Sequence, residues 1–187
     1  MFASQHFISL AVLIVSGDAL TPESSPSCAN GATEFCRHVL FTHEANRAAL
    51  KLLYEIDGRN GIKRLTKADG LVLALLNKTN ETRLRVLLKQ TLEAQLRALV
   101  MAKVDCFSRK EYIDLDEEAT CSLIYIDIGL GIVDLMEAII AVETDTLNKA
   151  KFQNLHDKIF EEKFIGRVDF SARIHETGKE ILMLMKP

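Results

Sequence analysis

Histidine and aspartate side chains are the groups in this sequence that could do acid-base or metal chemistry, but their spacing does not assemble a site. The five histidines are scattered along the chain: His6, His38, His43, His156 and His175. His38 and His43 lie five positions apart and miss the i, i+4 spacing of a helical metal pair. We therefore interpret each histidine as a satisfied surface or boundary residue, and predict no metal site and no cofactor.

Two aspartates form the best-placed pair of carboxylates. Asp127 and Asp134 lie one heptad apart, so on a helix they share a face and could serve as an acid and a base. A polar strip facing solvent is the more ordinary interpretation. The chain has no G-x-S-x-G elbow, no phosphate-binding P-loop and no H-E-x-x-H motif. We expect a protein that is not an enzyme and has no catalytic residues.

The cysteines form an even set of four: Cys28, Cys36, Cys106 and Cys121. Such a set suits two disulfide bonds in an oxidising compartment, whereas no pair has the short spacing of zinc-binding cysteines. Three pairings are possible. We favour Cys28 with Cys36 and Cys106 with Cys121, because each bond closes a short loop and stabilises the fold by about 2.5 to 3 kcal/mol.

The N-terminus has the features of a secretory signal peptide. An apolar run from Phe7 to Val15 is followed by small residues, and it is much shorter than the roughly 20 residues of a membrane span. A buried N-terminal helix is the alternative. We predict a signal peptide over residues 1–19, a single mature domain over residues 20–187, secretion and no membrane span. Two adjacent sequons after such a signal peptide predict a glycan on Asn77 or Asn80.

Composition and periodicity predict an all-α domain. The chain has no Trp and only three Pro, and its net charge of −3 is spread without the basic stripe of a nucleic-acid-binding protein. Apolar residues recur at helical spacing over six stretches: residues 33–57, 66–76, 81–104, 121–142, 146–164 and 171–185. Glycines 58 and 61 should end the first helix, and Thr66 with Asp69 resembles a capping box that starts the second.

These stretches predict an up-and-down helical bundle with an N-terminal disulfide-stapled extension. Residues 121–142 are apolar on nearly every side, as in a central helix, and Gly129 and Gly131 predict a close neighbour or a bend there. If the second and third stretches act as one long helix, all four cysteines gather at one end of the bundle.

Several segments share a pattern with one known family. Cys28 and Cys36 lie eight positions apart ahead of Val39 and Leu40, and Tyr125 follows Cys121 by four positions ahead of Glu137-Ala138-Ile139. With the closing stretch at residues 175–182, this pattern resembles the plant invertase and pectin methylesterase inhibitor family. The chain departs from the family in two ways: a fourth cysteine expected near Phe160 is missing, and Cys106 is additional.

The resemblance implies a non-catalytic inhibitor in the apoplast that binds and blocks a cell-wall invertase or a pectin methylesterase. Ala150-Lys151-Phe152 resembles the Pro-Lys-Phe loop with which invertase inhibitors contact the enzyme, without its proline. Lys151 and Phe152 are therefore candidate partner-binding residues, although Phe152 also suits a core position. A cytokine-like extracellular signalling protein and a bundle that carries a lipid are the rival interpretations.

Overall fold

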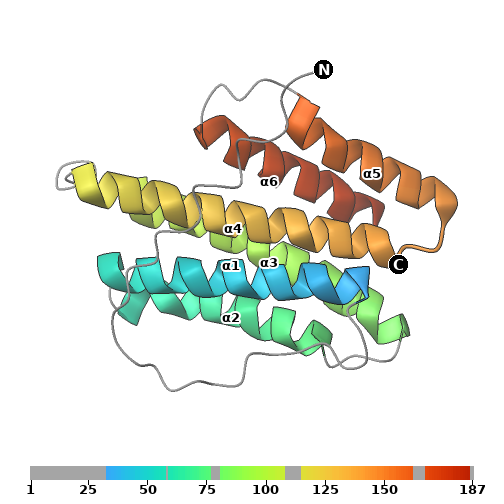
Figure 1. Cartoon of the computed structure of the whole chain (residues 1–187), viewed down its shortest axis with the longest axis horizontal. Helices are drawn as coiled ribbons and strands as arrows, with labels where there is room; N and C mark the ends of the chain where they lie inside the picture. Colours follow the sequence, from blue (N-terminus) through green and yellow to red (C-terminus); the bar gives the residue numbers. More distant parts are fainter. Residues whose placement is uncertain (1–32, 58, 77–80, 108–114, 162–166, 186–187) are drawn as a thin grey trace.

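Six helices make up the described part of the chain in a computed structural model (Figure 1). The structure describes residues 33–57, 59–76, 81–107, 115–161 and 167–185. The helices are α1 (Glu34–Asp57), α2 (Arg59–Leu76), α3 (Glu81–Phe107), α4 (Leu115–Val142), α5 (Thr146–Glu161) and α6 (Arg167–Leu184). Within these ranges there is no strand, so the all-α prediction is confirmed. None of the helices in these ranges is both long and apolar enough to cross a membrane.

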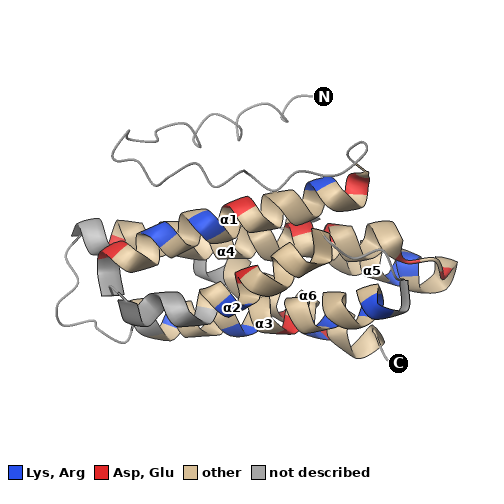
Figure 2. Ribbon diagram, turned by 90° about the horizontal axis from the view of Figure 1, so that it is seen from below, with Lys and Arg blue, Asp and Glu red and all other residues tan. Residues whose placement is uncertain are grey.

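Consecutive helices run in alternating directions, as predicted for an up-and-down bundle (Figure 1). The most extensive contact is between α1 and α4, followed by that between α1 and α2, while α5 and α6 pack on each other and on α4. Basic and acidic residues are interspersed along α1 (Figure 2). The predicted signal peptide and the predicted N-terminal extension lie outside the described residues.

The second helix begins earlier than predicted. It starts at Arg59, so Gly61 lies inside it and Thr66 is not at its N-terminus. The carboxylate of Asp69 bonds to His43 of α1 rather than to the backbone at a helix start, so the predicted capping box is wrong. The buried face of α2 carries Leu65, Ala68, Val72 and Leu75.

The most apolar helix, α4, lies against α1, α3, α5 and α6, as its composition predicts. Its two glycines face different neighbours. A Cβ atom on Gly129 would lie 3.1 Å from the Ile174 side chain of α6, and one on Gly131 would lie 3.4 Å from Ala45 of α1. The prediction that close packing explains these glycines is therefore confirmed, because α4 uses them to approach two helices.

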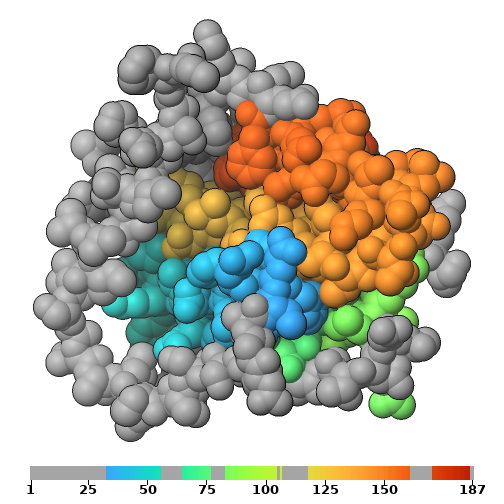
Figure 3. Space-filling model, turned by 45° about the vertical axis from the view of Figure 1, so that its right-hand side comes forward, coloured from blue at the N-terminus to red at the C-terminus, as the bar shows by residue number. Residues whose placement is uncertain are grey.

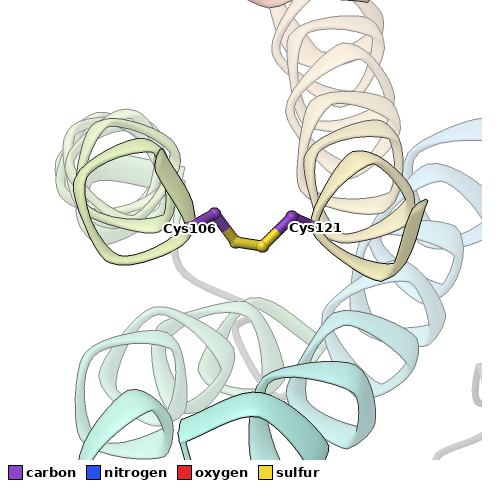
Figure 4. The surroundings of a disulfide bond; sticks show 2 residues. All are labelled: Cys106 and Cys121. Carbon is purple, nitrogen blue, oxygen red and sulfur yellow. A yellow bond between two sulfur atoms is a disulfide. The ribbon is translucent and has the colours of Figure 1, made fainter. Parts of the chain in front are cut away.

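A disulfide bond joins Cys106 at the end of α3 to Cys121 in the first turns of α4 (Figure 4). Their Cα atoms are 5.6 Å apart, and both residues are buried. This pairing is the predicted one. The predicted Cys28–Cys36 bond involves Cys28, which lies outside the described residues.

The prediction that all four cysteines gather at one end of the bundle is wrong. It required the second and third stretches to form one long helix, but α2 and α3 are separate helices that pack on each other. Cys36 lies in the first turn of α1. This N-terminal end of α1 lies beside the C-terminal half of α4, where His38 contacts Glu137. The Cys106–Cys121 bond lies at the N-terminal end of α4, at the opposite end of the bundle (Figure 1).

Candidate functional site

A pocket of about 420 Å³ opens where α1, α4 and α5 meet. The N-terminal half of α1, the C-terminal half of α4 and the length of α5 lie side by side on this face (Figure 3). The lining is mostly polar and carries both signs of charge: Glu34, Arg37, His38, Glu137, Ile140, Ala141, Lys149, Gln153 and His156. Its volume falls within the range of small-ligand sites.

Two histidines and two carboxylates from three helices meet in and beside this pocket. Nδ1 of His38 lies 2.8 Å from Oε2 of Glu137 and 3.4 Å from Oδ1 of Asp134. On the other side, Nε2 of His156 lies 3.2 Å from Oε1 of Glu137. Glu137 thus sits between the two rings, and we call these four residues the His-carboxylate cluster.

Close packing between α1 and α4 brings His38 to the carboxylates. The hydroxyl of Thr42 lies 2.9 Å from the carbonyl oxygen of His38 and 3.1 Å from that of Gly131, so its single proton is placed between the two helices. Gly131 permits this approach because it has no side chain where α1 passes. Asp134 and Glu137 follow Gly131 by one and two turns, so they project beside His38.

His156 reaches the cluster because a short turn returns the chain from α4 along α5. The turn is stabilised at its start, where Glu143 pairs with Arg85 of α3 at 3.3 Å. At its end, Oδ1 of Asp145 accepts a hydrogen bond from the Asn148 amide at 2.8 Å and caps α5. His156 then lies on the buried face of α5 with Phe152 and Ile159.

Burial and neighbouring charge shift the pKa values of three cluster residues. Burial raises the pKa of Asp134 to about 6, although the hydrogen bond with His38 opposes the shift. Interaction with His156 lowers the pKa of Glu137 despite partial burial, and the Glu137 carboxylate in turn raises the pKa of His156. The contact between Glu137 and His156 therefore favours the charged form of each of the two residues.

The cluster supplies imidazole nitrogens and carboxylate oxygens, which are ligands for divalent metal ions. One atom each from His38, Asp134 and Glu137 lies within 4.8 Å of the others. The predicted absence of a metal site rested on the spacing of histidines within one helix. The two histidines that meet here come from α1 and α5, and no sequence motif connects them.

A second set of polar residues is closed inside the bundle. Nδ1 of His43 on α1 lies 2.7 Å from Oδ1 of Asp69 on α2, and both side chains are largely buried. One turn further along α1, Oδ1 of Asn46 accepts a hydrogen bond from Nε2 of Gln95 on α3 at 3.1 Å. None of these residues lines the pocket, so we interpret this interior set as structural.

The structure places the remaining predicted site residues in different environments. Asp134 belongs to the cluster, whereas its heptad neighbour Asp127 does not, although burial raises the pKa of Asp127 to about 6. Phe152 is fully buried, so its ring belongs to the core and does not face a partner, because the helical phase of α5 turns it inward. Lys151 beside it is exposed. The predicted glycosylation residues Asn77 and Asn80 lie outside the described residues.

The chain was compared with models of known protein families, with curated proteins and with solved structures, and none of them matches it.

Proposed function

We propose that the protein is a secreted, non-catalytic inhibitor that binds a cell-wall invertase or a pectin methylesterase through the face formed by α1, α4 and α5. The observation that carries this proposal is the grouping of exposed apolar side chains beside the charged pocket. The choice of target enzyme rests on the sequence resemblance to the plant inhibitor family.

Helical spacing places three apolar side chains along the same side of the pocket. On α1, residues 34, 37 and 38 line the pocket and Phe41 follows one turn later. On α5, residues 149, 153 and 156 line it and Phe160 follows. On α4, which runs the other way, Leu130 precedes the pocket residue Glu137 by seven positions, about two turns. Each of the three helices therefore carries an apolar residue one or two turns beyond its polar pocket residues.

These three apolar side chains are accessible in the described structure. Phe41 is 47 % exposed, Leu130 44 % and Phe160 48 %. The Phe160 ring lies 5.4 Å, centre to centre, from the ring of His156, so it borders the cluster directly. Aromatic side chains next to a polar rim are typical of the central contacts of protein interfaces.

Secretion is part of the proposal and rests on two observations. The apolar run at residues 7–15 has the length of a signal-peptide core, and the disulfide between Cys106 and Cys121 is the kind of bond that persists in an oxidising compartment.

Titration of enzyme activity tests the proposal. Protein expressed with its own N-terminal segment in a eukaryotic secretory host should reduce the activity of invertase or pectin methylesterase from the same species stoichiometrically. Phe160→Ala should weaken inhibition at least tenfold, because it removes a central contact. Val86→Ala removes an apolar side chain of α3 that is 57 % exposed and lies outside this face, and this variant should inhibit like the wild type.

Full activity of both enzymes between pH 4 and 7, with oxidised inhibitor in excess, would overturn the proposal. Equal loss of inhibition in the Phe160 and Val86 variants would show that the contact lies outside the face formed by α1, α4 and α5. If both enzymes keep full activity, the extracellular signalling function becomes the better hypothesis.

A further inference from the structure

We propose that His38, Asp134, Glu137 and His156 bind one divalent transition-metal ion of the zinc type beside the pocket that three of them line. This inference does not depend on the proposed inhibitor function. The four residues that we call the His-carboxylate cluster supply all the ligands, and they come from α1, α4 and α5.

The distances between donor atoms suit a metal ion. Ligand atoms about 2.0 to 2.2 Å from a tetrahedral zinc ion lie about 3.3 to 3.6 Å from one another. In the cluster, the contacts of Nδ1 of His38 with Glu137 and Asp134 are 2.8 and 3.4 Å, and that of Nε2 of His156 with Glu137 is 3.2 Å. One atom each of His38, Asp134 and Glu137 lies within 4.8 Å of the others, and the proposed site requires the His156 ring to move so that Nε2 reaches the same ion.

The placement of His156 is a second reason, because its Nε2 atom faces Glu137 of the cluster. His156 is only 7 % exposed, and its Nε2 atom is buried without a hydrogen bond to any residue that the structure describes. The contact of Nε2 with Glu137 is close but does not have hydrogen-bond geometry. A buried polar atom without a well-formed hydrogen bond is costly, and a metal ion shared by Nε2 and the Glu137 carboxylate would satisfy it.

The surroundings orient the ligands as they do in known metal sites. Nδ1 of His156 lies 3.5 Å from Oδ1 of Asp157, a carboxylate that holds the ring with Nε2 directed at Glu137. Such a carboxylate behind a metal-binding histidine fixes the ring and strengthens the ligand. Asp134 and Glu137 are three positions apart on one helix, and helical bundles build metal sites from side chains on facing helices in this way.

The charge and ligand types favour zinc over calcium or magnesium. The two carboxylates balance the charge of a divalent ion. The two imidazoles suit zinc and its neighbours among the transition metals, whereas calcium and magnesium prefer oxygen ligands alone. The pocket connects the cluster with solvent, so an ion has a path to it.

Calorimetric titration with zinc chloride tests the inference. The oxidised, secreted protein without a polyhistidine tag should bind one zinc ion per chain, and cobalt at the same site should show the visible absorption of a four-coordinate ion. Glu137→Gln keeps the shape of the side chain and should weaken zinc binding at least a hundredfold, as should His38→Ala. His156→Ala should weaken it about ten- to a hundredfold.

Two controls separate ligand loss from damage to the fold. His175→Ala removes a histidine of α6 that lies outside the cluster and should bind zinc like the wild type. Circular dichroism of Glu137→Gln should match that of the wild type. Absence of zinc binding at millimolar concentration in the wild-type protein, or unchanged affinity in folded Glu137→Gln protein, would overturn the inference.

Discussion

Two histidine-carboxylate groups on α1 have similar chemistry and different surroundings. His43 pairs with Asp69 of α2 at 2.7 Å inside the bundle, whereas His38 contacts Asp134 and Glu137 of α4 beside an open pocket. The two histidines are five residues apart, which on a helix turns their side chains about 140° from each other. One ring therefore faces α2 and the other faces α4.

The difference shows how position, rather than residue type, separates a structural pair from a binding site. The interior pair has one histidine and one carboxylate at hydrogen-bond distance, and neither side chain lines the pocket. The pocket cluster has a second histidine whose Nε2 atom lacks a hydrogen bond among the described residues. We expect removal of a carboxylate to cost stability in the first group and ligand binding in the second.

The largest expected effect is the loss of the interior carboxylate. Asp69→Ala leaves His43 buried without its partner and should lower the free energy of unfolding by about 3 kcal/mol. Asp134→Ala removes a more accessible carboxylate at a longer distance and should change it by less than about 1 kcal/mol. Urea unfolding of both variants at pH 7 measures the difference. Equal losses would remove the distinction between the two groups.

A smaller effect is expected at the contact between α1 and α4 that positions His38. Gly131→Val places a side chain against Ala45 and the carbonyl oxygen of Thr42, and overpacking should cost about 2 kcal/mol. Because it pushes α1 away from α4, it should also weaken zinc binding. Gly70→Ala is the matched control, since nothing lies within 4 Å of the added atom, and it should stabilise α2 by about 0.5 to 1 kcal/mol. Unfolding curves that rank the two variants in the reverse order would contradict this packing.

The smallest effect concerns Asp127, a carboxylate on α4 outside both groups. Burial raises its pKa to about 6 from 3.8, so the folded state holds its proton more tightly than the unfolded state. The stability from protonation is fully present below about pH 4 and is lost as pH rises through 6. Because the group is partly exposed, Asp127→Asn should stabilise the protein by only about 1 kcal/mol at pH 7.5, and by nothing at pH 4.

Thermal or urea unfolding of wild type and Asp127→Asn across this pH range measures the effect. A stabilisation of the same size at pH 4 and pH 7.5 would show that the carboxylate of Asp127 titrates normally in the folded protein.

The fold was predictable where apolar spacing is regular. On α3, Leu88, Leu92 and Leu96 are buried as their four-residue spacing indicates, and the two glycines of α4 mark close contacts. The start of α2 was not predictable in this way, because glycines and an asparagine near Arg59 indicate a helix end. On α1, the buried residues Thr42, His43 and Asn46 are polar, and apolar periodicity cannot identify them as part of the core.

The sequence indicates acid-base chemistry for only one residue of the candidate site, Asp134. The heptad spacing of Asp127 and Asp134 drew attention to Asp134, but the partner it suggested lies outside the cluster. His38, Glu137 and His156 meet because three helices pack together, and no local spacing encodes that meeting. Phe152 is an example of the opposite error. The tripeptide Ala150-Lys151-Phe152 resembles a contact loop, but helix packing buries the Phe152 ring.

Nuclear magnetic resonance of the oxidised protein with nitrogen-15-labelled histidine is the most direct test of the distinction between the two groups. Zinc chloride added to one equivalent should shift the ring nitrogen signals of His38 and His156 and leave those of His43 unchanged. Shifts of His43 as large as those of His38, or no shift of either cluster histidine, would contradict the assignment of an interior structural pair and a metal-binding cluster.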